Sequence, residues 1–138
     1  MAAIEMSVTG QKKVGTLMRE FNTRFPYLGL RLYSPEVKNL GPGQSFTPYR
    51  IPTDKTLASV RAEGAAGGNI TITGHKKIKT LEHEFETVFG LYAQVCYCPK
   101  GCEAGKGYIT NSTQDEYTLA GFNDFCQKNG DNPYSYGE

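Results

Sequence analysis

The four cysteines of the chain, Cys96, Cys98, Cys102 and Cys126, all lie in its second half. Four thiolates are enough for a tetrahedral zinc site, and alternation along a strand would turn Cys96 and Cys98 to the same face. The spacing differs from the Cys-x2-Cys pairs of zinc knuckles, and Cys96 and Cys126 also suit small core positions. We therefore predict no cofactor and keep zinc as the alternative. In an oxidising compartment a disulfide would form instead.

A Gly-x-Lys-Lys turn occurs twice, at Gly10, Lys12 and Lys13 and again at Gly74, Lys76 and Lys77. Two lysines at the start of a helix oppose its macrodipole, and a bound anion would resolve this conflict through the free N–H groups and the ammonium groups. The turns thus suggest a site for a phosphate- or nucleotide-containing ligand. Alternatively, the lysines sit in a hairpin turn and face water. The spacing is not that of a P-loop, which needs more glycines and a Ser or Thr after the Lys.

Two histidines, His75 and His83, are the candidate acid-base groups. We expect His83 on the polar side of a helix among acidic residues, where a solvated side chain is favoured over a catalytic one. His75 would need a partner such as Asp115 or Cys102, and nothing in the sequence brings these residues together. No Gly-x-Ser-x-Gly, metal-binding His pair or dinucleotide fingerprint occurs. The sequence therefore favours a binding protein over an enzyme.

The elements that would position these residues form an internal repeat. Residues 9–25 read TGQKKVGTLMREFNTRF, and residues 73–89 read TGHKKIKTLEHEFETVF. Ten of the 17 aligned positions are identical, at a spacing of 64 residues (74 − 10). A second match follows, because the sequence Thr-Leu-Ala at 56–58 recurs at 118–120. The repeated unit is therefore about half of the chain.

Each unit is predicted to contain a strand, a helix, a strand, a short strand and a second helix. The expected strands are 4–8, 28–33 and 46–51 in the first unit and 69–73, 92–98 and 107–110 in the second. The first helix of each unit carries an apolar stripe up to Phe25 or Phe89, and Thr16 and Thr80 are alternative N-caps for it. The last helix would open near Thr53 or Asp54 in the first unit and near Thr113 or Asp115 in the second.

The predicted architecture is α+β, with two tandem repeats packed as one pseudo-twofold globule. The first repeat is expected at 1–66 and the second at 67–130, because a unit of about 60 residues gains stability from a shared core. A polar C-terminal tail follows at 131–138 and is expected to be frayed, unless Tyr134 and Tyr136 dock on a neighbour.

Composition and charge exclude some classes of protein. The formal net charge is +1, which does not indicate a nucleic-acid partner. No apolar stretch approaches the roughly 18 residues of a membrane span, and residues 1–10 do not read as a signal peptide. We therefore expect a cytoplasmic protein without a membrane partner, in which reduced thiols or a metal site are favoured over disulfides.

Two resemblances follow from these patterns. The turn at Ser7–Gly10, the helix that opens on Thr-Leu and the segment Asp54–Ser59 resemble the ubiquitin-like β-grasp. The chain as a whole resembles small uncharacterised two-repeat proteins of Bacteroidetes-type bacteria, which implies a bacterial, cytosolic origin and no particular activity. Neither resemblance names a site, because a shared fold does not transfer function.

Three functions remain as hypotheses. Internal symmetry without a catalytic set favours a non-enzymatic binding or adaptor protein that presents two related surfaces to a protein partner, or to another copy of itself. The alternative is a binder of a small anionic ligand at the Gly-x-Lys-Lys turns. The third is a small hydrolase-like enzyme around His75.

Overall fold

The chain folds as an α+β structure, and the computed structural model describes residues 5–102, 107–111 and 113–136. The α-helices are α1 (Val14–Arg24), α2 (Ile78–Phe89) and α3 (Leu119–Lys128). One antiparallel sheet joins β1 (Glu5–Val8) to β3 (Ile70–Thr73), and the other has the order β2 (Leu28–Tyr33), β4 (Tyr92–Tyr97), β5 (Tyr108–Ile109). The connections contain the 3-10 turns η1 (Pro35–Asn39), η2 (Thr47–Tyr49), η3 (Ala58–Val60) and η4 (Gln114–Glu116). Within these ranges no helix combines the length and the apolar character needed to cross a membrane.

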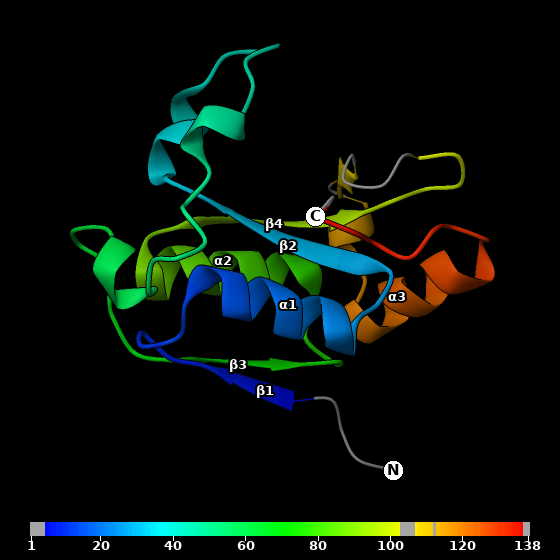
Figure 1. Cartoon of the computed structure of the whole chain (residues 1–138), viewed down its shortest axis with the longest axis horizontal. Coiled ribbons are helices and arrows are strands. Elements are labelled where there is room, and N and C mark those ends of the chain that lie inside the picture. Colours follow the sequence, from blue (N-terminus) through cyan, green and yellow to red (C-terminus); the bar gives the residue numbers. More distant parts are fainter. Residues whose placement is uncertain (1–4, 103–106, 112, 137–138) are drawn as a thin grey trace.

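The elements form layers, with α1 and α2 lying between the two sheets (Figure 1). The apolar stripes of the two helices meet the inward faces of the sheets in one continuous hydrophobic core. Its largest fully buried side chains are phenylalanines, namely Phe21, Phe25, Phe85, Phe89 and Phe122. Burying these rings supplies much of the driving force for folding, because each removes a large apolar area from water.

Each sheet combines strands from both halves of the chain. Ser7 of β1 pairs with Thr71 of β3, and Arg31 of β2 pairs with Gln94 of β4. The strands on either side of each long helix therefore lie in different sheets. A β-grasp, in which the strands of one unit share a sheet, is not found within either half. β1 and β3 pair across the halves, as do β2 and β4, while β5 pairs with β4 of its own half.

The sequence alone did not determine the first residue of the two long helices. In the structure, hydrogen bonds from residues later in the chain fix where each helix begins. α1 begins at Val14, whose N–H donates to the carbonyl of Lys55 at 2.9 Å. α2 begins at Ile78, whose N–H donates to the carbonyl of Tyr117 at 3.0 Å. These carbonyls satisfy helix N–H groups that have no partner within the helix, so the helices begin before the Thr-Leu steps.

Two predicted elements of the first half differ from the structure. The segment 46–51, expected as a strand, contains the 3-10 turn η2, because Pro48 favours the start of a helical turn and has no N–H for a strand ladder. Only Arg50 of this segment forms a β-bridge, with Tyr33. The second helix of the first half is reduced to the single turn η3, since a glycine-rich stretch follows it, whereas the second half has the full helix α3.

The C-terminal segment 131–136 is packed against the protein, so the prediction of a frayed tail is wrong for these residues; 137 and 138 lie outside the described residues. Tyr134 is only 5% exposed, and its N–H donates to the carbonyl of Pro26 at 2.9 Å. The hydroxyl of Tyr136 accepts the N–H of Leu30 at 3.0 Å. The segment thereby covers part of the free edge of β2, which would otherwise expose unpaired backbone groups.

Candidate functional site

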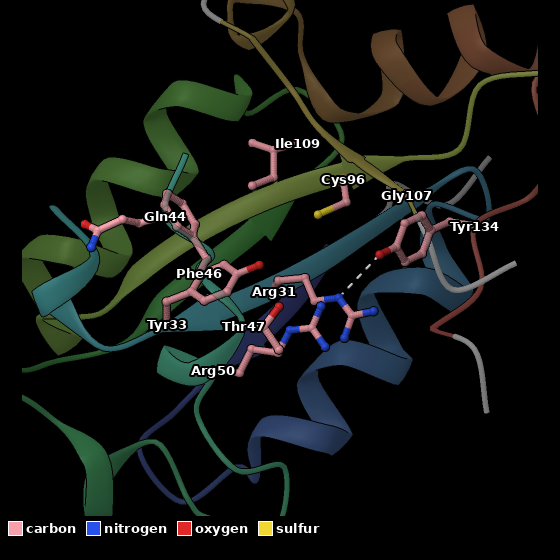
Figure 2. Close-up of a pocket in the computed structure, with 10 residues that line it drawn as sticks. All are labelled: Arg31, Tyr33, Gln44, Phe46, Thr47, Arg50, Cys96, Gly107, Ile109 and Tyr134. Carbon is pink, nitrogen blue, oxygen red and sulfur yellow. Dashed lines mark hydrogen bonds between the residues drawn. The ribbon is translucent and has the colours of Figure 1, made fainter. Parts of the chain in front are cut away.

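A pocket of about 360 Å³ lies on the outer face of the β2–β4–β5 sheet, away from the helices (Figure 2). Its walls come from the sheet, from the loop that follows β2, and from the C-terminal segment. The lining residues are Arg31, Tyr33, Gln44, Phe46, Thr47, Arg50, Cys96, Gly107, Ile109 and Tyr134. None of them carries a carboxylate, whereas two carry a guanidinium group.

Arg31 enters the pocket because of the alternation along β2. Leu28, Leu30 and Leu32 belong to the hydrophobic core on the helix side of the sheet. Successive side chains of a strand point to opposite faces, so Arg31 and Tyr33 belong to the outer face. Arg31 is only 9% exposed, which is unusual for a charged residue and indicates a specific environment.

Arg50 reaches the same face through a short antiparallel contact with the end of β2. The N–H of Ser34 donates to the carbonyl of Tyr49 at 2.9 Å, and the N–H of Ile51 donates to the carbonyl of Leu32 at 3.0 Å. These bonds place Arg50 opposite Tyr33 in a β-bridge. Residues opposite each other in an antiparallel pair share a face, so Arg50 projects beside Tyr33.

The two arginines are close enough to act on the same neighbours. Burial, and the negative charge that Cys96 carries as a thiolate, raise the pKa of Tyr33, and Arg50 and Arg31 oppose this rise. Burial likewise raises the pKa of Cys96 to about 11, against the opposing effect of both arginines. Desolvation outweighs the arginines in both cases, so the phenol and the thiol stay protonated near neutral pH.

Both arginines have hydrogen-bonding capacity to spare. Arg31 Nε–H donates to the hydroxyl of Tyr134 at 3.4 Å, and its guanidinium carbon lies 5.0 Å from the centre of the Tyr136 ring. A guanidinium group has five N–H donors, so Arg31 can bind a ligand while it keeps the bond to Tyr134. In the described ranges 5–102, 107–111 and 113–136, neither Arg31 nor Arg50 has a carboxylate partner.

Tyr134 forms one end of the pocket and is held by two glycines. A Cβ at Gly29 would lie 2.2 Å from the Tyr134 ring, and a Cβ at Gly107 would lie 2.4 Å from it. The ring therefore lies directly on the backbone at both positions, where any larger residue would displace it. Burial is the main reason that the pKa of Tyr134 rises to about 12. Its hydroxyl is thus a neutral group that helps to orient Arg31.

Aromatic side chains form the opposite end of the pocket. The centre of the Phe46 ring lies 5.3 Å from the centre of the Tyr33 ring and 5.9 Å from that of Tyr92. In both pairs the two rings are nearly at right angles. Ile109 of β5 adds an apolar side chain that is 41% exposed. Edge-to-face contacts are a favoured geometry for aromatic pairs, so Phe46 is fixed by contacts on two sides.

The lysines of the two Gly-x-Lys-Lys turns have partners within the protein. Lys12 forms an ion pair with Glu20, and Lys76 forms the equivalent pair with Glu84. These lysine side chains are only 17% and 15% exposed. The first N–H groups of both helices are also bound by loop carbonyls, as described above. Lys12 and Lys76 are therefore engaged in ion pairs that hold the fold, whereas the side chains of Lys13 and Lys77 are exposed.

The remaining residues of these turns contact the segment after the first helix of their own half. Lys13 forms a backbone bridge with Thr56, and Lys77 forms one with Thr118. A Cβ at Gly10 or at Gly74 would lie only 3.0 Å from the methyl group of an alanine in that segment. The glycines are needed for this close approach.

The cysteines do not assemble into one four-thiolate site. Cys98 and Cys102 form a disulfide, contrary to the expectation of reduced thiols. Cys96 is a buried free thiol in the same small cluster as Cys98, whereas Cys126 is buried in the main core. Among the described residues there is no group of three or more His, Cys, Asp or Glu side chains that could hold a metal ion. The disulfide joins two cysteines only four positions apart, so a short Cys-x3-Cys loop brings their sulfurs together.

Both histidines are exposed, His75 in the turn before α2 and His83 on the outer side of that helix. Asp115, the partner considered for His75, instead accepts a hydrogen bond from the hydroxyl of Thr110. The structure thus gives His83 the solvated position that the sequence analysis favoured.

The pocket residues were not identified from the sequence. The one local signal is Arg31, a charged residue between Leu30 and Leu32 in an otherwise apolar strand. Arg50 lies in the segment wrongly predicted as a strand, and Tyr134 lies in the tail expected to be frayed. No family model matches the chain, and no curated protein or solved structure matches it.

Proposed function

We propose that the protein binds a small organic anion in the pocket between Arg31 and Arg50. The observation that carries this proposal is the pair of guanidinium groups that face one pocket of about 360 Å³ without a carboxylate partner in the described residues. A buried positive charge is costly unless it is paired, and an anionic ligand would supply the missing partner.

The chemistry of the pocket suits carboxylate or phosphate groups. The planar guanidinium group forms two parallel hydrogen bonds with either group, which adds geometric specificity to charge attraction. Arg31 is almost fully buried, so its interaction with an anion is less weakened by water than one on the surface. Arg50 is exposed and can approach the ligand from the solvent side.

The same groups favour binding over catalysis. Tyr33, Cys96 and Tyr134 all have a raised pKa, so each is protonated near neutral pH. A protonated phenol or thiol donates hydrogen bonds but does not act as a general base or a nucleophile. The pocket can therefore hold and orient an anion without a group suited to attack it.

Replacement of Arg50 tests this proposal. Arg50→Gln should weaken the binding of phenyl phosphate or benzoate by about 10-fold or more, because a hydrogen bond to a charged group contributes roughly 1.5–3 kcal/mol. Isothermal titration calorimetry at low salt measures the dissociation constant directly. Arg50 is exposed, so the fold should tolerate the change.

Arg19→Gln is the matched control, since it removes the same charge from an exposed position on α1. It should leave the dissociation constant almost unchanged. Equal weakening by both variants would mean that the ligand senses only the overall charge of the protein, and the proposal would fail.

We also propose that the chain is a two-repeat, pseudo-twofold structure. Ser7 and Thr71, which pair with each other, are 64 positions apart (71 − 7), the spacing of the sequence repeat. The ion pairs of Lys12 and Lys76 and the bridges at their neighbouring lysines recur in both halves. The pocket lies on the outer face of only one of the two sheets. The proposed symmetry therefore describes the arrangement of helices and strands and does not imply two equal binding sites.

The partner-binding function expected from the sequence is our second candidate, and a different surface favours it. Tyr108, Tyr117 and Phe125 are 58%, 40% and 44% exposed. Ring contacts connect them through Tyr97 and Phe122 into one aromatic surface. Exposed aromatic clusters are typical of protein interfaces. This surface includes α3, which the first half lacks, so it is a single surface and not one of two related ones.

A further inference from the structure

We infer that the anion bound by Arg31 and Arg50 carries a flat aromatic body, which lies against Phe46. This inference rests on the proposed function and specifies the class of ligand. It follows from the size of the pocket, from the separation of its charged and apolar walls, and from the way in which Phe46 is held.

The pocket is much larger than the anionic group alone requires. One water molecule takes roughly 30 Å³ of the liquid, and a phosphate or carboxylate group replaces only a few of them. The pocket has about 360 Å³, which lies in the range of sites for whole organic molecules. Most of the volume therefore remains for a ligand body next to the charged group.

The walls of the pocket differ in character from one side to the other. Figure 2 shows the side chains of Arg31 and Arg50 on one side, with Phe46 and Ile109 on the other. Tyr33 lies between them, with an apolar ring and a polar hydroxyl. A ligand whose anionic group meets the arginines would thus place its body against apolar side chains. Burying an aromatic body there releases water from both surfaces.

Phe46 is prepared to receive a flat group. Its two edge-to-face contacts with Tyr33 and Tyr92 fix the orientation of the ring, although the residue is only partly buried. A ring that is already fixed loses little conformational freedom when a ligand binds, so more of the contact energy appears as affinity. Phe46 and Arg50 also come from the same loop, which couples the apolar wall to one of the two charges.

A comparison of matched anions tests the inference. Phenyl phosphate and methyl phosphate share a phosphate group, and benzoate and acetate share a carboxylate group. We expect the aromatic member of each pair to bind the wild-type protein about 10-fold or more tightly, because each 1.4 kcal/mol of contact with the apolar wall is a factor of ten. Calorimetry or ligand-observed NMR with the full chain gives the four dissociation constants.

Phe46→Ala and Phe46→Leu distinguish the contribution of the apolar wall to binding from that of the two arginines. Phe46→Ala should bring the affinities for phenyl phosphate and methyl phosphate close together while leaving the affinity for methyl phosphate unchanged. Phe46→Leu keeps an apolar side chain and should retain part of the preference, which guards against an effect of misfolding. Phe125→Ala removes a phenylalanine from the separate aromatic surface and should leave the preference intact.

The outcomes distinguish this inference from the proposed function. Equal affinity of the wild-type protein for the aromatic and the small anion overturns the inference, while a loss of binding in Arg50→Gln would still support the anion site. A preference that survives Phe46→Ala also overturns the inference. If none of the four anions binds, the proposed function itself is wrong.

Discussion

Single residues determine whether the pocket exists. Arg31 would be an ordinary surface charge on an exposed strand, but the C-terminal segment covers it and leaves its guanidinium group directed at the pocket. That cover depends on Gly29 and Gly107, because Tyr134 occupies the space of their missing side chains. The specificity of the site thus depends on residues that cannot themselves contact a ligand through a side chain.

Gly29→Ala should destabilise the protein by about 1–3 kcal/mol, since the new methyl group would overlap the Tyr134 ring and force it out of its position. Urea unfolding followed by circular dichroism measures the change. Gly41→Ala is the control, because a Cβ there meets its nearest neighbour, Gln44 Oε1, at an ordinary 3.8 Å. The control should change the free energy of unfolding by less than about 0.5 kcal/mol. An equal loss in both variants would show that the Tyr134 contact is unimportant.

At the scale of elements, the hydrophobic pattern predicted α1, α2 and the paired strands, but it did not predict the loop after β2, which carries four of the ten pocket residues. The apolar stripes of α1 and α2 are local features, so their periodicity is visible in the sequence. The start of α1 depends on the carbonyl of Lys55, and the position of Arg50 depends on a bridge to Tyr33. Such long-range contacts leave no periodic pattern of apolar residues in the sequence. The loop after β2, which contains Arg50, has no such pattern of its own.

Helix α2 is also connected to the sheet by an acidic side chain. Glu82 accepts a hydrogen bond from the N–H of Val95 at 3.2 Å. Burial is the main cause that raises the pKa of Glu82 to about 8, and the nearby Asp115 carboxylate adds to the rise. The folded protein therefore holds a proton on Glu82 near neutral pH. The counterpart of Glu82 in the first half is Met18, 64 positions earlier (82 − 18), so this feature belongs to the second half alone.

The raised pKa predicts a pH-dependent stability. The stabilisation from protonated Glu82 is complete below the pKa of an unfolded glutamate, about 4.3, and is lost as the pH rises through about 8. The free energy of unfolding should thus fall across this range, by on the order of 5 kcal/mol. Glu82→Gln should flatten the profile and be more stable than the wild type at pH 9. Urea unfolding at several pH values measures this effect.

Exposed Glu63 provides the control for that experiment. Glu63→Gln should reproduce the pH profile of the wild type. If Glu82→Gln has the same slope as the wild type between pH 5 and 9, then Glu82 is already ionised in the folded protein and the assignment of its proton is wrong.

At the scale of the whole molecule, the two candidate surfaces and the repeated sequence motifs lie in different parts of the chain. The pocket and the aromatic surface of Tyr108, Tyr117 and Phe125 lie where the halves differ: in the loop after β2, in α3 and in the C-terminal segment. The repeated parts, such as the Gly-x-Lys-Lys turns, hold the elements together. Both candidate sites are therefore built largely from the segments in which the two halves differ.

The aromatic surface gives a prediction about association. If it binds a second copy of this chain, native mass spectra recorded at rising protein concentration should show a dimer. The double variant Tyr117→Ser with Phe125→Ser should remain a monomer, because the apolar area that drives association is lost. Arg50→Gln, which alters the pocket, should associate like the wild type. If the wild-type protein stays monomeric at every concentration, the hypothesis of self-association through this surface is wrong.

The exchange of strands between the halves has a consequence for how stability depends on concentration. A chain containing only one unit would lack a pairing partner for a strand of each sheet. It could complete both sheets only by meeting another molecule, so its folding would weaken on dilution. The covalent connection through residues 61–69 replaces that encounter by an intramolecular one with a high effective concentration. The single chain therefore completes both sheets at any dilution.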